Sequence, residues 1–265
     1  MRSIEELVVN IFAAIVVFAL GVGARSAVSY IRSRRGRRFW GRHIIGGRTR
    51  LFLGSFDRDY ILEPSGFVGL GDNHALYELA TELGRLGVFF EIAYASRLMD
   101  NQHRENLILL GFGDVNSLAP IVLAKIGTGF VVDVDDMTIT DTQTRKVYET
   151  EWEEYRLAEN QLPAFGDGWS IVAKGEDRFA RRLRADYGVL IRTRSPFRPD
   201  RTLVVIAGIY GYGTWAGARL PLDEEFLRQC EDLDGFGLEC LYRVEILQGQ
   251  LIATSVEELR SIPAA

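Results

Sequence analysis

The segment from Thr202 to Ala218 constrains the fold of this chain more than any other stretch. Its apolar run, Leu203 to Ala207, is too short for an ordinary helix and contains Val, Val and Ile, so it predicts a strand buried on both faces. Glycines follow at positions 208, 211 and 213, and Thr214 is suited to cap a helix that begins at Trp215. The segment therefore predicts a strand, a glycine turn and the amino terminus of a helix.

An earlier segment, Asn106 to Pro120, repeats this plan with an apolar strand, two glycines and a helix that starts near Asp114 to Ser117. In an open α/β sheet, such turns lie at the carboxyl ends of the strands, where ligands bind. We expect the two turns to face one crevice. The candidate ligand-binding residues of this crevice are Gly111, Gly113, Asp114, Asn116, Gly208, Gly211, Gly213 and Thr214.

Glycine turns of this kind let backbone N–H groups approach a phosphate, and the helix that follows contributes its positive end. The spacing Gly208-x-x-Gly-x-Gly-Thr214 differs from the dinucleotide pattern G-x-G-x-x-G, and no Lys-Ser or Lys-Thr pair follows as in a P-loop. A tight structural turn is therefore the alternative. Asp114 and Asn116 leave a similar choice between contacting a sugar or base and capping the helix.

The first half of the chain alternates between strand and helix patterns. A strand within residues 44–56 is followed by a helix that starts at Gly71 to His74, and Phe89 to Ala95 predicts the next strand. This rhythm favours a parallel sheet with right-handed crossovers.

The second half departs from that rhythm. Residues 130–152 predict a β-hairpin or β-insertion, and residues 153–183 predict a long polar loop. Further strands are predicted at 186–193 and 237–254, and an amphipathic helix at 222–233. The predicted fold class is α/β, a Rossmann-like sheet with βαβ units and an additional β-hairpin region, preceded by one amino-terminal transmembrane helix.

The predicted membrane helix is the segment Leu7 to Ala24, 18 residues that carry no charge and one polar side chain. This length is at the short end of what spans a hydrocarbon core about 30 Å thick, and Arg25 can extend it by snorkelling. A cleaved signal peptide and a buried core helix are the alternatives. Glu5 and Glu6 argue against the first, and the uniformly apolar character of the segment argues against the second.

Nine arginines lie between residues 25 and 50, a stretch without acidic residues. The positive-inside rule keeps such a stretch in the cytoplasm. We therefore expect a single-pass protein of the cell membrane, with an anchor at 1–24, a basic juxtamembrane segment at 25–43 and a cytoplasmic α/β domain at 44–265.

The basic segment is compatible with binding to nucleic acid or to anionic lipid headgroups. Its place beside a membrane helix favours lipid and disfavours nucleic acid. The predicted membrane-surface residues are Arg34, Arg35, Arg37, Arg38 and Trp40.

The candidate catalytic residues are Glu91, Asp114 and His74. Desolvation in an apolar strand would suit a carboxylate such as Glu91 to attack or protonate a sugar, whereas pairing with an arginine would make it inert. The carboxylates of Asp133 and Asp135 share a strand face, but no second acidic cluster is evident, and the two cysteines have no metal spacing. We expect no metal site.

The βαβ start, the Gly111 to Asn116 turn and the Gly208 to Gly217 turn together resemble the Rossmannoid nucleotide-sensing and nucleotide-processing domains of bacteria, namely the SLOG, TIR and nucleoside deoxyribosyltransferase-like families. The resemblance covers residues 46–128 and 186–218. It implies a nucleotide-derived ligand and a carboxylate at the sugar, for which Glu91 is the nearest analogue. Joined to a membrane anchor, it also implies bacterial stress or defence signalling.

Three functions follow from these patterns. The first is a membrane-anchored domain that senses a nucleotide-derived ligand and forms a homo-oligomer. The second is a membrane-tethered enzyme that cleaves an N-glycosidic or related nucleotide bond with Glu91 or Asp114. The third is an interaction scaffold without a ligand. Beyond the nucleotide ligand, no cofactor is indicated.

Overall fold

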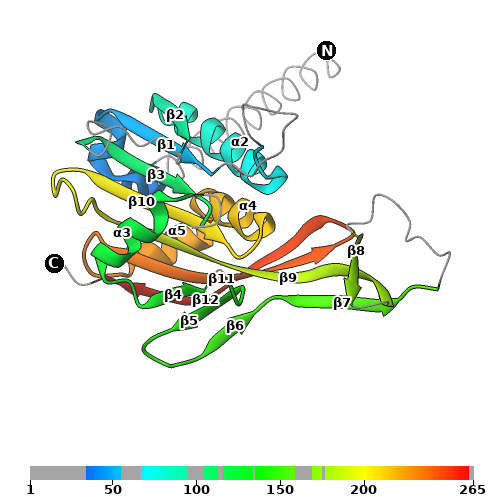
Figure 1. Cartoon of the computed structure of the whole chain (residues 1–265). Helices are drawn as coiled ribbons and strands as arrows, with labels where there is room; N and C mark the ends of the chain where they lie inside the picture. Colours follow the sequence, from blue (N-terminus) through cyan, green and yellow to red (C-terminus); the bar gives the residue numbers. More distant parts are fainter. Residues whose placement is uncertain are drawn as a thin grey trace, which may run out of the picture.

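The computed structural model describes residues 34–54, 67–94, 104–112, 116–133, 135–158, 169–174 and 177–262. One mixed sheet runs through the molecule, with helices on one face and a helix and a smaller sheet on the other (Figure 1). The strands of the main path follow the order β12-β11-β9-β10-β3-β1-β2.

The parallel half of the main sheet consists of β1 (Thr49–Leu53), β2 (Phe90–Tyr94), β3 (Asn106–Leu110) and β10 (Thr202–Gly208). β1 pairs in parallel with β2 and with β3, and β3 pairs in parallel with β10. Helices α2 (Leu70–Arg85), α3 (Leu118–Ile126) and α4 (Gly211–Arg219) follow β1, β3 and β10 along the chain. The predicted α/β class is therefore confirmed, and the central sheet is parallel in this half.

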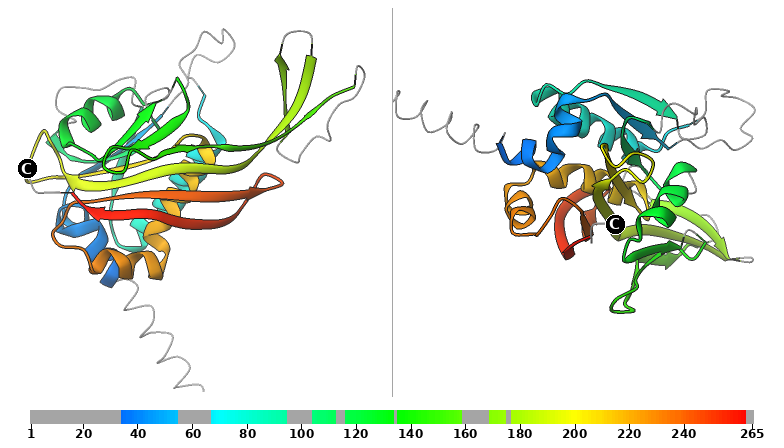
Figure 2. Two further views of the ribbon diagram at one scale, coloured as in Figure 1. Left: turned by 90° about the horizontal axis from the view of Figure 1, so that it is seen from below. Right: turned by 90° about the vertical axis from the view of Figure 1, so that its left-hand side faces the viewer.

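The antiparallel half consists of β9 (Asp177–Arg194), β11 (Leu238–Leu247) and β12 (Gln250–Ser261). Two further strands, β7 (Glu151–Arg156) and β8 (Trp169–Lys174), pair with the first half of β9. Together they form an arm that projects from the rest of the molecule (Figure 2).

The prediction of a loop at 153–183 is wrong for the residues that the structure describes, because most of them belong to this arm. In its β9 portion, the buried residues Ala180 and Leu183 are separated by partly exposed arginines. Both faces of such a strand are partly exposed to solvent, so its sequence is as rich in polar residues as that of a loop.

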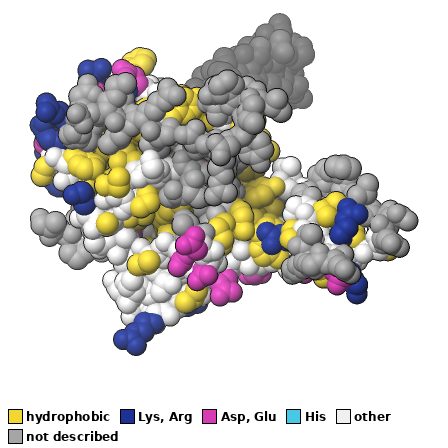
Figure 3. Space-filling model, in the orientation of Figure 1, with side chains coloured by type: hydrophobic (Ala, Val, Ile, Leu, Met, Phe, Trp, Pro, Cys, Tyr) yellow, Lys and Arg dark blue, Asp and Glu magenta, His cyan; other side chains and the backbone are white. Residues whose placement is uncertain are grey.

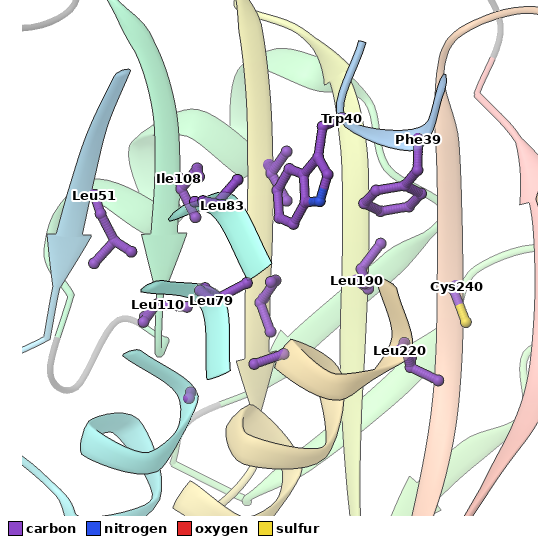
Figure 4. Close-up of a cluster of buried hydrophobic side chains, with 14 of the residues drawn as sticks. Phe39, Trp40, Leu51, Leu79, Leu83, Ile108, Leu110, Leu190, Leu220 and Cys240 are labelled. Carbon is purple, nitrogen blue, oxygen red and sulfur yellow. The ribbon is translucent and has the colours of Figure 1, made fainter. Parts of the chain in front are cut away.

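Alternate residues of the central strands contribute to two hydrophobic cores, one on each face of the main sheet. On β3, Ile108 and Leu110 face the core formed with α2, α4, α5 (Glu224–Glu231) and the helical segment 34–46, whereas Leu107 and Leu109 face the opposite core. A short 3-10 helix, η3 (Leu220–Leu222), joins α4 to α5. Figure 4 shows the first core, in which side chains of the 34–46 helix pack against β9.

The opposite core is covered by α3 and by a small antiparallel sheet of β4 (Phe130–Asp133), β5 (Thr138–Asp141) and β6 (Val147–Glu149). The predicted β-insertion is thus a three-stranded sheet. Arg260 of β12 bridges it to the main sheet, because its guanidinium pairs with the buried carboxylates of Asp141 and Glu239.

Among the described residues, no helix has the length and apolar character needed to cross a membrane. The predicted span, Leu7 to Ala24, lies outside those residues.

Candidate functional site

The two glycine turns lie at the same edge of the sheet, because β3 and β10 are neighbouring parallel strands. The N–H of Gly111, which follows β3, donates to the carbonyl of Ile206 in β10 over 3.1 Å. Gly111 has a φ of 83°, a conformation that favours glycine. Gly111 of the first turn therefore lies beside the end of β10.

The second turn already surrounds an acidic side chain of the protein. The carboxylate of Asp186, in β9, accepts hydrogen bonds from the backbone N–H groups of Gly213 (2.6 Å), Tyr210 (3.1 Å) and Tyr187 (2.8 Å). Asp186 is fully buried, and this burial raises its pKa to about 8 even though the three hydrogen bonds act to lower it. The amides that the sequence suggested for a ligand phosphate are thus bonded to a side chain of the protein.

The glycines of this turn allow close backbone contacts. A Cβ atom on Gly208 would lie 2.4 Å from the Cα of Gly213, and one on Gly217 would lie 2.1 Å from the hydroxyl oxygen of Tyr242. A Cβ on Gly71, at the start of α2, would lie 2.1 Å from the carbonyl oxygen of Gly211. Packing between α2, α4 and β10 therefore explains these positions without a ligand.

Thr214 and Asn116 have structural roles. α4 begins at Gly211, so Thr214 lies inside the helix rather than at its predicted cap, and its hydroxyl oxygen accepts the N–H of Gly208 over 3.1 Å. Asn116 is fully buried. It donates to the carbonyl of Leu110 over 2.9 Å and accepts the N–H of Leu118 over 3.2 Å, so it fixes the start of α3 from the position before the N-cap residue Ser117.

Gly113 and Asp114, which are also candidate ligand-binding residues, lie outside the described residues. His74 of α2 stacks on Trp215 of α4, with ring centroids 4.3 Å apart and an angle of 18° between the rings. Glu91 lies on the edge strand β2, where its side chain is 58% exposed and pairs with Arg50 over 2.8 Å and Arg48 over 3.4 Å. The arginine-paired alternative considered for Glu91 is thus the observed one.

Asp133 forms the turn between β4 and β5. Its carboxylate accepts the N–H groups of Asp135 and Asp136 over 2.9 and 3.0 Å. The described part of the chain contains no group of three or more His, Cys, Asp or Glu side chains that could hold a metal ion.

The predicted membrane-surface residues do not form one exposed surface. Trp40 is fully buried in the first core, so its assignment to the membrane surface is wrong. Arg35 and Arg38 pair with Glu231 of α5, and Arg37 donates to the carbonyl of Leu86. Arg34 is exposed. The segment around Trp40 is helical and amphipathic, and its apolar side belongs to the α/β domain.

A cavity of about 690 Å³ lies beside the glycine turn, between the small sheet and the arm. Trp152 of β7 and Tyr210 of the turn meet edge to face, with ring centroids 5.3 Å apart, and the guanidinium of Arg181 lies 3.9 Å from the centroid of Trp152. The remaining walls combine three apolar residues, Val131, Met137 and Val147, with polar and acidic ones, namely Asp133, Asp136, Thr138, Thr140, Glu149 and Thr150. Figure 3 shows acidic side chains over the small sheet and basic ones on the arm.

Sequence reasoning missed this cavity because Arg181 was assigned to a loop and Trp152 to the end of a hairpin. Their meeting depends on the pairing of β7 with β9, in which Trp152 lies opposite Leu183. One local signal for Asp186 was present, namely an acidic residue beside an apolar strand, and the same signal singled out Glu91.

Comparisons of the chain with protein-family models, with curated proteins and with solved structures found no match.

Proposed function

We propose that this chain is a single-pass membrane protein whose Rossmann-like domain senses a nucleotide-derived ligand in the cavity formed by Trp152, Arg181 and Tyr210. One observation carries the proposal. The guanidinium of Arg181 lies 3.9 Å from the ring centroid of Trp152, and Trp152 meets Tyr210 edge to face, so a cation and two aromatic rings line the same cavity. A fixed cation beside aromatic rings suits a ligand that carries both a phosphate and a base.

The chemistry of the cavity walls fits the parts of a nucleotide. The aromatic side chains of Trp152 and Tyr210 suit contact with a base, and Arg181 already covers one face of Trp152. The guanidinium of Arg181 suits a phosphate, and the carboxylate of Asp136 and the hydroxyl of Thr138 suit sugar hydroxyl groups. The volume of about 690 Å³ lies within the range of small-molecule sites, about 300 to 1,000 Å³.

Sensing is favoured over cleavage of a nucleotide bond. Glu91, the carboxylate suggested for cleavage, is paired with two arginines and does not line this cavity. The membrane anchor of the proposal is the apolar segment Leu7 to Ala24, and the arginines after it favour a cytoplasmic domain. A role in bacterial stress or defence signalling fits this arrangement.

The test uses the full chain in phosphatidylcholine nanodiscs and follows thermal unfolding with ATP, NAD and cyclic dinucleotides. A ligand at about 100 times its Kd adds about 2.7 kcal/mol of stability. We expect Arg181→Gln and Trp152→Leu to abolish the ligand-dependent shift. Arg184→Gln is the matched control, because Arg184 lies on the same strand, is exposed and does not line the cavity. A shift that survives Arg181→Gln, or no shift with any ligand, would contradict the proposal.

A further inference from the structure

A second cavity, of about 180 Å³, lies where the helical segment 34–46 packs against β9 and α5. It shares no residue with the cavity beside the glycine turn. Its lining combines apolar residues with four charged ones, three of which are arginines. The lining side chains that matter here are Arg35, Arg38, Phe39, Arg192, Glu231 and Phe236.

Arg192 is a buried cation without a counter-charge. It is only 6% exposed, and no described carboxylate lies within ion-pair distance of it. Its guanidinium donates to the carbonyl of Phe39 over 2.7 Å and twice to that of Phe236, over 3.0 and 2.8 Å. These three bonds leave two of the five N–H groups of the guanidinium for another acceptor.

The rings of Phe39 and Phe236 fix this guanidinium. It lies 5.0 Å from the ring centroid of Phe39 and 4.7 Å from that of Phe236. Burial lowers the pKa of Arg192 to about 10, so it remains charged at neutral pH. A fixed, charged donor of this kind costs little to order when an anion binds.

The mouth of the cavity adds two more cations. Arg35 pairs with Glu224 over 3.0 Å and Glu231 over 3.4 Å, and Arg38, 68% exposed, pairs with Glu231 over 3.6 Å. Of these carboxylates only Glu231 lines the cavity. The lining residues therefore carry three positive charges and one negative charge, an excess of two positive charges.

We infer that this cavity binds a phosphate group through Arg192 and Arg38. The planar guanidinium fork matches the oxygen geometry of a phosphate, and the excess positive charge complements its negative charge. The volume of about 180 Å³ is below the range of nucleotide-sized sites, so the occupant is a small phosphate group. Either a lipid headgroup or free phosphate supplies this chemistry.

The experiment uses the full chain in nanodiscs and has two arms. In the first, phosphatidylcholine nanodiscs are titrated with inorganic phosphate against chloride at equal ionic strength. In the second, phosphatidic acid replaces part of the lipid and no phosphate is added. Thermal unfolding is followed in both, and binding of radiolabelled phosphate is measured by equilibrium dialysis in the first.

We expect a rise in unfolding temperature in at least one arm, and the responding arm identifies the source of the phosphate. Arg38→Gln should weaken that response about tenfold, as expected for the loss of one charge-assisted hydrogen bond. Arg228→Gln is the matched control, because Arg228 is an exposed arginine of α5 that does not line the cavity. No response in either arm, or an equal loss with Arg228→Gln, would overturn the inference.

Discussion

The carboxylate of Asp186 and the backbone N–H of Gly213 form a 2.6 Å hydrogen bond inside the turn that follows β10. In dinucleotide-binding folds, N–H groups at this position meet the phosphate of the ligand. Here β9 supplies the hydrogen-bond acceptor from within the protein, and a ligand phosphate would reach these amides only by displacing Asp186. For this reason the proposed ligand site lies beside the turn, against Tyr210, and not on its N–H groups.

Removing this carboxylate should destabilise the fold. Asp186→Ala leaves the buried N–H groups of Tyr210 and Gly213 without their acceptor, and each such group costs about 1 to 3 kcal/mol. We expect a loss of about 3 kcal/mol or more in the free energy of unfolding, measured by urea denaturation. Asp186→Asn should lose less stability, because the side-chain carbonyl oxygen of asparagine can still accept some of these N–H hydrogen bonds. Equal stability of Asp186→Ala and the wild type would show that the turn does not need this hydrogen-bond acceptor.

The same carboxylate predicts a pH dependence of stability. Its pKa is about 8 in the folded chain and 3.8 ordinarily, so between these values the folded state keeps a proton that the unfolded state has released. The contribution of Asp186 is therefore complete below about pH 4 and is lost as the pH rises toward 8, by at most about 1.4 kcal/mol per pH unit. The measurement compares wild type with Asp186→Asn at pH 5 and pH 8. The stability advantage of the wild type should shrink at the higher pH, and a constant difference would mean that Asp186 stays ionised.

Two glycines of α2 form a matched pair for the contact between α2 and α4. A Cβ on Gly71 would lie 2.1 Å from the carbonyl oxygen of Gly211, whereas one on Gly84 meets nothing within 4 Å. We expect Gly71→Ala to cost about 1 to 3 kcal/mol, because backbone must move. Gly84→Ala should be neutral or stabilising by up to about 1 kcal/mol, since alanine favours a helix. Thermal unfolding of both variants checks this, and similar unfolding temperatures would refute the close packing.

The sequence predicted the parallel half of the sheet because its strands are continuous apolar runs bounded by glycines, as in Leu203 to Ala207. That pattern is local. The arm was missed because both faces of this part of β9 are partly exposed to solvent, so arginines such as Arg181 occur along the strand. The role of Arg192, also in β9, could not be predicted because its hydrogen-bond partners lie 44 and 153 residues away in the sequence. Asp186 and Gly213 are separated by 27 residues, so their bond depends on the antiparallel pairing of β9 with β10.

The ion network of Arg260 should be essential for joining the two sheets. Arg260 pairs with Asp141 and Glu239, both of which are buried. Arg260→Met leaves two buried carboxylates without a cation, and removing one partner of a buried pair costs about 3 to 5 kcal/mol. Arg198→Met is the control, because its pair with Asp200 is exposed and contributes about 1 kcal/mol or less. Urea denaturation that gave equal losses for the two variants would rule out a special role for the network.

Trp40 distinguishes a domain core from a membrane surface. Its side chain is fully buried beside Phe39, so Trp40→Ala should cost about 3 to 5 kcal/mol in the free energy of unfolding. Its Nε1 atom has no hydrogen-bond partner among the described residues, so Trp40→Phe gives up no bond there and should cost much less. Both variants are compared by denaturation in phosphatidylcholine nanodiscs. If Trp40 lay at the membrane surface instead, Trp40→Ala would leave the stability of the domain unchanged, because no cavity would form inside it.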